Sequence, residues 1–382
     1  MLVLLAAATI GSLGSCSALT DVSRRKLVTG GAASVLANVA LVEPRGAYAA
    51  AAAVAKKIPL GKLGIGAWAW GDTFFWGYDE KLDAELAETF AFLAKNKAKL
   101  GFIDTAEVYG FGRSETLIGE FAAKTPGFDI PIATKFAALP WRTKASDVVE
   151  ACEASLKRLG RNKIELYQIH FPNGWSNEAY WDGLAQCVEK GLVESVGVSN
   201  YGVEATRAVH AALAKRGIPL ASNQIQFSAL YRFPEENGLL QTCKELDVDV
   251  LAYSPLCLGL LTGKFTRENG ALPTGPRKGI TETYLADDRF TALQQTMASV
   301  GAAHGAPPAA VALNWCRAKG TIPIAGARTL KQAKQNLACL DWDLTGAEVG
   351  AIDASARQLP WLGISPPFAN KDVFTGMKMF DS

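Results

Sequence analysis

Short apolar segments rich in β-forming residues alternate with longer segments of helical period along most of the chain. The strand-like segments are residues 63–69, 102–105, 130–136, 164–170, 194–199, 220–226, 248–254 and 321–325. The helical patterns include residues 83–100, 146–159, 177–190, 203–215, 235–246 and 330–340. The strand segments contain apolar runs rather than a strict alternation of apolar and polar residues, which is typical of parallel strands covered on both faces. The alternation therefore predicts an (α/β)8 TIM barrel, as a single domain over residues 56–382.

The alternative for such an alternation is an open, doubly wound sheet that binds a dinucleotide. That fold carries G-x-G-x-x-G directly after its first strand. The sequence GIGAWA at residues 64–69 lacks the third glycine, and TGK at residues 262–264 lacks the upstream glycine of a phosphate-binding P-loop. Closure into a barrel also removes both edges of the sheet. We therefore favour the barrel.

Charge and cysteine content exclude several classes of protein. Lys and Arg number 39 against 37 Asp and Glu, and 49% of residues are hydrophobic, so neither disorder nor a nucleic-acid partner is indicated. No two of the seven cysteines have the C-x-x-C spacing of zinc or dithiol sites, and three histidines are too few for a multi-histidine metal site. We expect no metal, six reduced and buried cysteines outside the leader, and a monomer.

The first 50 or so residues have the character of a targeting presequence. Residues 1–10 are nearly all apolar, paired arginines stand at 24–25, a weakly apolar stretch covers 29–42, and an A-x-A site lies at 47–49. This pattern resembles a twin-arginine signal; an ordinary transit or secretory presequence is the alternative. Two signals in series suit either import into a plastid with several membranes or onward export to a thylakoid, so we expect a plastid (chloroplast) protein, with a thylakoid-associated or lumenal location as one alternative. Neither apolar stretch reaches the ~18 residues that cross a bilayer, so the mature protein is expected to be soluble or peripheral.

The longest stretch without a clear period covers residues 262–286 and is rich in Gly and Pro. Loops of this length inside a compact domain tend to be functional. In a barrel this segment follows the seventh strand at the catalytic end. We therefore predict that it covers a bound ligand.

Four polar residues lie at or just beyond the ends of strands two to four: Asp104, Tyr109, Lys135 and His170. Catalytic groups of such barrels occupy this position. Charged groups at the end of a buried strand are costly unless they are paired, so a converging cluster is expected. Taken singly, Asp104 could cap a turn, Lys135 could pair with a surface acid and His170 could be a core histidine.

As a cluster, these residue types fit the reduction of a carbonyl group. Hydride delivery to the carbonyl carbon leaves an alkoxide that needs a proton, and a phenol with a pKa of ~10 is a poor donor near neutrality. Lys135 beside Tyr109 is expected to lower the pKa of the phenol, with Asp104 keeping Lys135 protonated. His170 could hydrogen-bond and polarise the substrate oxygen. Tyr109 is then the general acid in reduction and the base in oxidation.

The segments that carry these residues resemble the active-site segments of the aldo/keto reductase family. They are FIDTAEVYG at 102–110, ATKF at 133–136 and LYQIH at 166–170. The resemblance continues through GVSNY at 197–201, SNQ at 222–224, AYSPL at 252–256 and IPIAGAR at 322–328. It covers nearly all of residues 58–358. Residues 134–142 and 217–224 resemble plastid NADP-dependent members, including pyridoxal reductase-like enzymes.

The resemblance implies a tetrad of Asp104, Tyr109, Lys135 and His170 beside an extended NADP(H) across the C-terminal end of the barrel. The cofactor contacts it implies are Ser199, Asn200 and Gln224 at the carboxamide, Tyr253 on the nicotinamide, Ser254, Leu256 and Lys264 at the pyrophosphate, and Gly326, Ala327, Arg328, Gln332, Gln335 and Asn336 at the adenosine 2′-phosphate. Because a guanidinium pairs well with phosphate, Arg328 favours NADPH over NADH. Its tripeptide Gly-Ala-Arg replaces the Gly-Ala-Lys or Gly-Thr-Ser common among relatives.

Aromatic residues crowd the loops after strands one, three and four. The expected substrate pocket consists of Trp68, Trp70, Trp76, Trp141 and Trp175. Phe75 and Phe171 are expected to pack within these loops. The aromatic lining predicts an apolar cleft for an aromatic or lipid-derived aldehyde or ketone, and no basic cluster marks an anionic substrate.

Three functional hypotheses follow. The first is an NADPH-dependent reductase of small carbonyl compounds. The second is a redox-sensing or regulatory module that holds NADPH and turns over slowly, because an intact tetrad fits both. The third is a reductase specific for pyridoxal.

Overall fold

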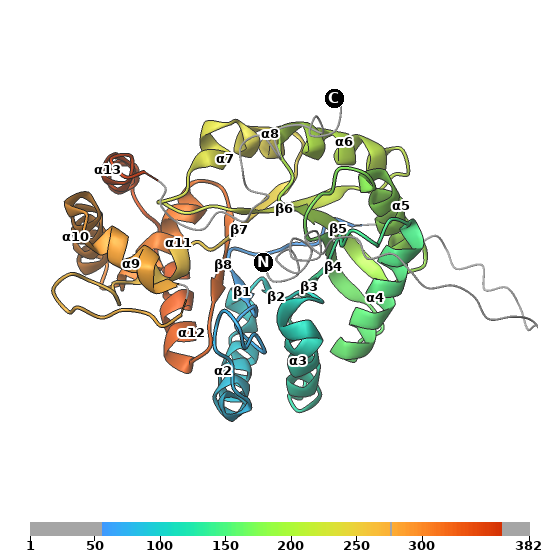
Figure 1. The fold of residues 1–382 in the computed structure, drawn as a ribbon, viewed down its shortest axis with the longest axis horizontal. Coiled ribbons are helices and arrows are strands. Elements are labelled where there is room, and N and C mark those ends of the chain that lie inside the picture. Colours follow the sequence, from blue (N-terminus) through green and yellow to red (C-terminus); the bar gives the residue numbers. More distant parts are fainter. Residues whose placement is uncertain (1–55, 276, 361–382) are drawn as a thin grey trace, which may run out of the picture. The chain divides into compact units, whose positions relative to one another are not determined.

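The computed structural model of the protein describes residues 56–275 and 277–360. The predicted presequence, residues 1–50, lies outside these ranges. The described residues form a closed barrel of parallel strands in sequential order, in which the first strand pairs with the second and the eighth (Figure 1). The strands are β1(Gly64–Gly66), β2(Phe102–Asp104), β3(Ile132–Phe136), β4(Ile164–Ile169), β5(Val193–Ser199), β6(Leu220–Gln226), β7(Asp249–Tyr253) and β8(Ile322–Gly326). The predicted TIM barrel is confirmed.

Helices surround the barrel (Figure 1). The α-helices are α2(Asp83–Lys95), α3(Arg113–Ala123), α4(Ala145–Leu159), α5(Asn177–Glu189), α6(Val203–Ala214), α7(Phe233–Glu236), α8(Leu239–Glu245), α9(Arg277–Leu285), α10(Asp288–Ala303), α11(Pro308–Ala318), α12(Leu330–Leu337) and α13(Gly346–Ala356). The short 3-10 helices are η2(Glu80–Leu82), η3(Lys97–Lys99), η4(Tyr109–Gly112), η5(Cys257–Thr262) and η6(Ala338–Leu340). No helix of the described chain is long and apolar enough to span a membrane.

Two predicted segments differ from the structure. The single helix expected over residues 235–246 is two helices, because Gly238 adopts a left-handed conformation with φ of 84° between them. The segment 262–286, expected to lack secondary structure, contains α9, whose buried side chains are Thr281, Tyr284 and Leu285. Their spacing is a helical stripe, but it is too short to stand out beside the Gly and Pro that precede it.

Apolar side chains fill the barrel between its N-terminal end and the polar layer described below. Phe102, Ala133 and Leu166 from successive strands cluster there with Ile58 and Leu60, which precede β1. The backbone of Lys56 and Ile58 is tied to Glu194 and Ser195 of β5. A larger cluster lies between the strands and α2 to α6. The six cysteines of the described residues are free and buried, and their burial was predicted.

Candidate active site

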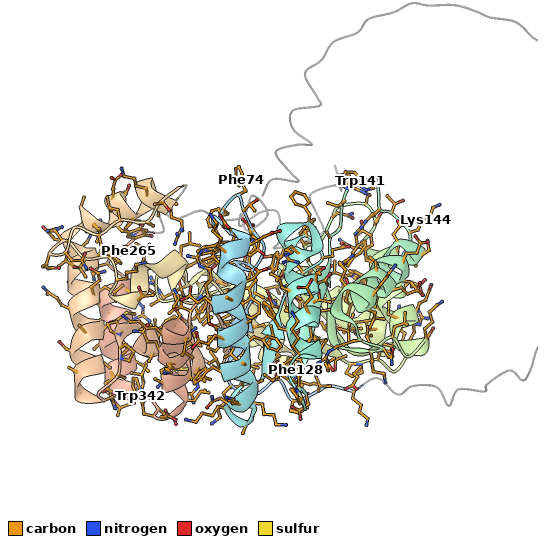
Figure 2. All side chains as sticks on the ribbon, turned by 90° about the horizontal axis from the view of Figure 1, so that it is seen from below. Phe74, Phe128, Trp141, Lys144, Phe265 and Trp342 are labelled. Carbon is orange, nitrogen blue, oxygen red and sulfur yellow. The ribbon has the colours of Figure 1, made fainter. Side chains whose placement is uncertain are left out.

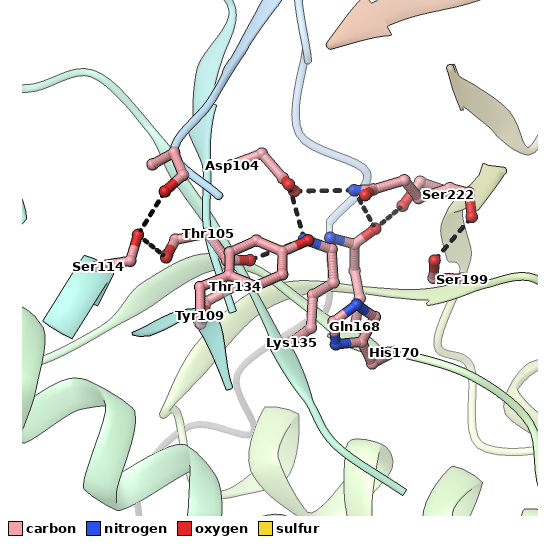
Figure 3. Close-up of polar contacts among 12 residues, drawn as sticks. Asp104, Thr105, Tyr109, Ser114, Thr134, Lys135, Gln168, His170, Ser199 and Ser222 are labelled. Atoms are coloured by element: carbon pink, nitrogen blue, oxygen red, sulfur yellow. Dashed lines mark hydrogen bonds and ion pairs between the residues drawn. The ribbon is translucent and has the colours of Figure 1, made fainter. Parts of the chain in front are cut away.

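The alternation of side chains along a strand places a polar layer above the apolar floor of the barrel. Residues two apart in a strand point to the same face. Asp104 therefore follows Phe102 into the interior, and Lys135 follows Ala133. In β4, Leu166 is followed by Gln168. The polar groups of three neighbouring strands consequently meet at the C-terminal end (Figure 3).

The ammonium of Lys135 is the centre of this layer. It is fully buried and donates hydrogen bonds to Asp104 Oδ1 at 2.6 Å, to the backbone oxygen of Thr105 at 2.7 Å and to the Tyr109 hydroxyl at 3.4 Å. An ammonium has three donors, so these contacts use all of them. The other carboxylate oxygen of Asp104 accepts from Gln224 Nε2 at 2.8 Å. Both charges are held in fixed positions.

Tyr109 is carried by a tight turn after β2. Gly110, Phe111 and Gly112 all have positive φ, at 57°, 54° and 92°. A Cβ on Gly110 would lie 2.4 Å from the Gly71 carbonyl oxygen, so only glycine fits this close approach of two loops. The turn brings the ring of Tyr109 under the ammonium of Lys135, at 4.9 Å from its centroid.

His170 lies directly after β4 and faces the same hollow. Its ring centroid is 5.6 Å from that of Tyr109, edge to face. Its backbone is held on both sides, by the carbonyl of Phe136 and by the side chain of Asn200. Nδ1 of the imidazole is buried without a hydrogen-bond partner among the described residues. The structure thus brings Asp104, Tyr109, Lys135 and His170 together and leaves one buried polar atom available to a ligand.

Burial dominates the proton equilibria of the ion pair and the phenol. It raises the pKa of Asp104 against the attraction of Lys135, and it lowers the pKa of Lys135 against the attraction of Asp104. Burial and then the charge of Asp104 raise the pKa of Tyr109 well above 10. The expectation that the pKa of Tyr109 is lowered is therefore wrong for this structure, because burial and the charge of Asp104 raise it.

The imidazole of His170 is shifted in the other direction. Burial and then the positive charge of Lys135 lower its pKa well below the usual value. His170 is therefore neutral at pH 7, while Tyr109 keeps its proton. A neutral imidazole and a protonated phenol can both donate a hydrogen bond to an uncharged oxygen.

A layer of buried amides and hydroxyls lies beneath the tetrad. Ser222 Oγ approaches Gln168 Oε1 at 3.5 Å (Figure 3). Gln224 Nε2 approaches the same oxygen at 3.5 Å and also donates to Asp104 Oδ2. Sequence reasoning did not select Gln168. The sequence feature that could have identified Gln168 is its position two residues before His170, on the inward face of β4. Nε2 of Gln168 is buried without a partner among the described residues.

The ends of β5 to β7 contribute a second group of polar side chains. Ser199 Oγ donates to the Gln224 backbone oxygen at 2.7 Å, and Asn200 Nδ2 donates to Ser199 Oγ at 3.1 Å. Tyr253 Oη donates to Asn200 Oδ1 at 2.9 Å. Asn200 and Ser254 have φ of 64° and 53°, a strained conformation for residues with a Cβ. Ser199, Asn200, Gln224 and Tyr253 therefore form one connected group beside His170.

The remaining predicted cofactor residues lie along η5 and the start of α12. Lys264 is exposed, and Leu256, Gln332 and Gln335 are partly exposed. Gly326 is exposed, with its carbonyl held by the buried Asn336 at 3.1 Å. The Ala327 side chain is buried and its carbonyl accepts from Trp70, so only its backbone N–H remains for a ligand. Gln332 Oε1 accepts from the Arg328 backbone at 2.8 Å.

Sequence reasoning missed Arg277, the first residue of α9. Its guanidinium stacks on the ring of Trp76 at 4.7 Å, and its Nε is buried without a partner among the described residues. Burial and then the charge of Arg328 lower its pKa. Arg328 itself donates to the Trp76 backbone oxygen at 2.9 Å. The available signal was a basic residue within the long segment after strand seven.

Arg277 contacts the ring of Trp76 and Arg328 contacts its backbone oxygen, an arrangement of two positive charges that suits an anion. Among the described residues neither takes part in a salt bridge, although most other arginines do. A phosphate group neutralises such a pair and satisfies its donors. The unpartnered Nε of Arg277 and Nδ1 of His170 therefore fit an extended, phosphate-bearing cofactor.

Comparison with known proteins decides the family. The profile of the Aldo/keto reductase family matches residues 62–357. The chain belongs to the aldo/keto reductase family. It is 38% identical over 327 residues to the chloroplastic pyridoxal reductase of Arabidopsis thaliana, covering 80% of this chain and 87% of that protein. It is 27% identical over 290 residues to the aldo-keto reductase yakc of Schizosaccharomyces pombe, whose name specifies NADP(+), covering 72% and 84%.

Solved structures agree with the barrel of this aldo/keto reductase. The glycerol dehydrogenase of Gluconobacter oxydans has a TM-score of 0.67 and 26% sequence identity. The alignment covers 82% of this chain and 96% of that one. The chain is thus an oxidoreductase that spans nearly the whole length of its structural neighbour.

The predicted pocket tryptophans of the reductase fall into three groups. Trp70 does not line the pocket: it is fully buried among Phe90 of α2 and Phe121 of α3, and its Nε1 donates to Ala327. The prediction failed because an apolar residue near a strand end can turn outward to the helices. Trp68 and Trp76 lie at the site, with the Trp68 ring 6.0 Å from that of Tyr109 and edge-on to Trp76.

Trp141 and Trp175 lie in the loops after β3 and β4 and are 70% and 56% exposed. They are at the catalytic end but project into solvent. Phe75 is buried and stacks on Trp68, as expected of a residue that packs its loop, and Phe171 packs partly against the core.

Proposed function

We propose that this aldo/keto reductase uses NADPH to reduce aldehydes or ketones to alcohols, with Tyr109 as the general acid. The observation that supports this most directly is the convergence of the Tyr109 hydroxyl and Asp104 on one buried ammonium, that of Lys135. A hydroxyl in that position, beside the neutral ring of His170, matches the proton donor that a carbonyl reduction requires.

Each residue of the tetrad has a separate proposed role in the reaction. Tyr109 hydrogen-bonds the carbonyl oxygen and transfers its proton as negative charge develops there. His170 donates a second hydrogen bond to the same oxygen. Lys135 stabilises the phenolate that remains, and Asp104 balances the charge of Lys135. Bound NADPH supplies the two electrons and the hydrogen that the carbonyl carbon gains.

The cofactor is proposed to extend from the tetrad to α12. Ser199, Asn200 and Gln224 would hold its carboxamide end, and Tyr253 would stack on the nicotinamide. Arg328 and Arg277 would hold its phosphates, because within the described residues they are the two arginines at the catalytic end that lack an acidic partner. The NADP(+) specified for the yeast relative supports NADPH as the cofactor.

Pyridoxal is a second candidate substrate, favoured by the 38% identity to a plant pyridoxal reductase. The chloroplast location of that relative supports a plastid location here, with residues 1–50 as the presequence.

The test is a panel of aldehydes and ketones, including pyridoxal, offered to the purified protein with NADPH or NADH. We expect NADPH oxidation with several members of the panel and a lower KM for NADPH than for NADH. Tight NADPH binding without oxidation by any carbonyl compound would contradict the enzymatic proposal and leave the redox-sensing module. Turnover of pyridoxal alone would identify the narrower reductase.

A further inference from the structure

Two neighbouring polar residues at the start of α3, Ser114 and Glu115, are fully buried. Neither belongs to the tetrad. A buried carboxylate costs free energy unless it is paired and hydrogen-bonded. The helix follows directly after the turn that carries Tyr109. The contacts of Ser114 and Glu115 therefore indicate what the start of α3 holds in place.

Ser114 joins the loop after β1 to the end of β2. Its Oγ donates to the Ala67 backbone oxygen at 2.9 Å and lies 2.8 Å from Thr105 Oγ1 (Figure 3). A hydroxyl has one hydrogen, so Thr105 is the donor in the second contact. The Ala67 backbone N–H donates in turn to the Asp104 backbone oxygen at 2.8 Å. Ser114 thus fixes Asp104 and Thr105, the two residues whose carboxylate and backbone oxygen accept from Lys135.

Glu115 holds the neighbouring strand, β3. Its Oε1 accepts from Thr134 Oγ1 at 2.5 Å, and its Oε2 accepts from Arg158 Nε of α4 at 2.6 Å. Arg158 therefore balances the charge of the buried carboxylate. Thr134 immediately precedes Lys135, and neighbouring side chains of a strand point to opposite faces. Glu115 consequently holds β3 from its outer face at the level where Lys135 points into the barrel.

Gly112 allows Arg158 to reach Glu115. It has φ of 92°, and a Cβ at this position would lie 2.9 Å from Arg158 Cδ. Gly112 is also the last residue of η4, the turn that carries Tyr109, and the N-cap of α3. The turn of the phenol and the ion pair behind β3 therefore depend on the same glycine.

Three members of the tetrad are thus attached to the start of one helix, whereas His170 is held elsewhere. Resting on the proposed function, we propose that Ser114 and Glu115 are positioning residues, which hold β2 and β3 where Asp104 and Lys135 form their ion pair beside Tyr109. They act through Thr105 and Thr134, and not on the substrate.

Glu115 also supports the charge of Lys135. Burial lowers the pKa of Lys135, and the carboxylates of Asp104 and Glu115 oppose that decrease. Loss of the Glu115 charge, or of the Thr134 contact that aligns β3, should therefore destabilise the ammonium. Further ionisable groups on the neighbouring elements are Tyr109, His170 and, paired with Glu115, Arg158.

The kinetic test compares Thr134→Val, which removes the hydroxyl at nearly constant shape, with Thr134→Ser, which keeps it. For Thr134→Val and Ser114→Ala we expect kcat for aldehyde reduction to fall about tenfold, because small displacements of catalytic groups lower the rate steeply. The affinity for NADPH should change less than about twofold, since the residues of β5 to β8 are untouched. Thr134→Ser should keep kcat within about threefold of wild type.

Thr321→Val is the matched control. Thr321 is buried, and its Oγ1 donates to the Cys316 backbone oxygen at 2.8 Å. It precedes β8 and so lies at the N-terminal end of the barrel, which Trp342 marks in Figure 2, opposite Phe74 and Trp141. Its loss removes an equivalent hydrogen bond far from the tetrad, so kcat should stay within about twofold of wild type.

An NMR titration separates this inference from the proposed function, because it needs no turnover. Lysine labelled with carbon-13 at Cε reports the protonation of Lys135, whose signal is the one lost in Lys135→Met. We expect Lys135 to lose its proton at lower pH in Thr134→Val and Glu115→Gln than in the wild-type protein. Thr134→Ser and Thr321→Val should titrate as wild type.

A lowered titration of Lys135 in these two variants supports the inference even if no carbonyl compound is reduced. An unchanged titration in both would overturn it, whether or not aldehydes are turned over. Equal losses of kcat in Thr134→Val and Thr321→Val would also overturn it, because general destabilisation would then account for the effect. Equal losses in Thr134→Val and Thr134→Ser would do the same, since the hydroxyl would not matter.

Discussion

Within the described residues, the two halves of the catalytic end differ in whether their positively charged side chains have acidic partners. In the half formed by β1 to β4, Lys135 is paired with Asp104, and Arg142 is paired with Glu107. In the half formed by β5 to β8, Arg277 and Arg328 both contact Trp76, and within the described residues neither has a carboxylate partner. The charges of the first half are balanced without a ligand, whereas the two arginines of the second half have no counter-charge among the described residues. The difference supports the proposal that a neutral reacting group occupies one half and a phosphate-bearing cofactor the other.

Tyr109→Phe gives the strongest test of the proposal that the β1 to β4 half carries the reaction and the β5 to β8 half binds the cofactor. Removing the hydroxyl deletes the proton donor but leaves the β5 to β8 half intact. We expect the rate of aldehyde reduction to fall at least about 100-fold, with NADPH affinity unchanged within about twofold. Steady-state kinetics and cofactor fluorescence titration measure the two quantities. Turnover close to wild type would remove Tyr109 from the general-acid role, and a large loss of NADPH affinity would show that the halves are not separate.

Arg328→Ala tests the opposite half. If Arg328 binds the 2′-phosphate, its removal deletes a charge-assisted hydrogen bond and should raise the KM for NADPH roughly 10- to 100-fold, with little effect on NADH. Arg277→Ala should act in the same direction. Arg267→Ala is the matched control, because Arg267 lies in the same segment but is paired with Asp288. Equal effects on NADPH and NADH would contradict the assignment.

Local pattern was sufficient to predict the barrel and the convergence of polar residues from the strand ends, whereas the tetrad as a set was implied by the resemblance to the family. Apolar runs of strand length fix the barrel, and polar residues at strand ends must meet wherever neighbouring parallel strands end together. Asp104, Lys135 and His170 are such residues. The alternation with period two then determines which of them point inward.

Other features depend on tertiary packing that no local pattern contains. The burial of Trp70 was missed because its side chain turns to α2 and α3. Arg277 was missed because only the folded chain brings α9 to Trp76. The raised pKa of Tyr109 depends on how completely the phenol loses solvent, which the presence of Lys135 in the sequence does not reveal.

The pH dependence of reduction tests the protonation states of Tyr109 and His170 in the β1 to β4 half. The acid form of Tyr109 is present below its raised pKa, and the neutral form of His170 is present above its lowered pKa. Both required forms therefore coexist across the neutral range. We expect kcat for reduction to change less than about threefold between pH 6 and 9. A titration centred near pH 7 to 8 would show that one of these groups is not buried as the structure has it.

Glu107→Gln should have the smallest effect on catalysis. It tests whether the ion pair of Glu107 with Arg142, in the β1 to β4 half, stabilises the fold and does not bind the cofactor. The amide can still accept a hydrogen bond from Ala137, but the charge that balances Arg142 is lost. We expect a loss of about 1–3 kcal/mol in the free energy of unfolding, seen as a lowering of Tm by about 2–8 °C, with the KM for NADPH unchanged. Glu120→Gln is the control, because its pair with Arg113 is exposed at 3.3 Å and should contribute less than about 1 kcal/mol. A raised KM for NADPH in Glu107→Gln would mean that this carboxylate serves the cofactor, and the contrast between the halves would fail.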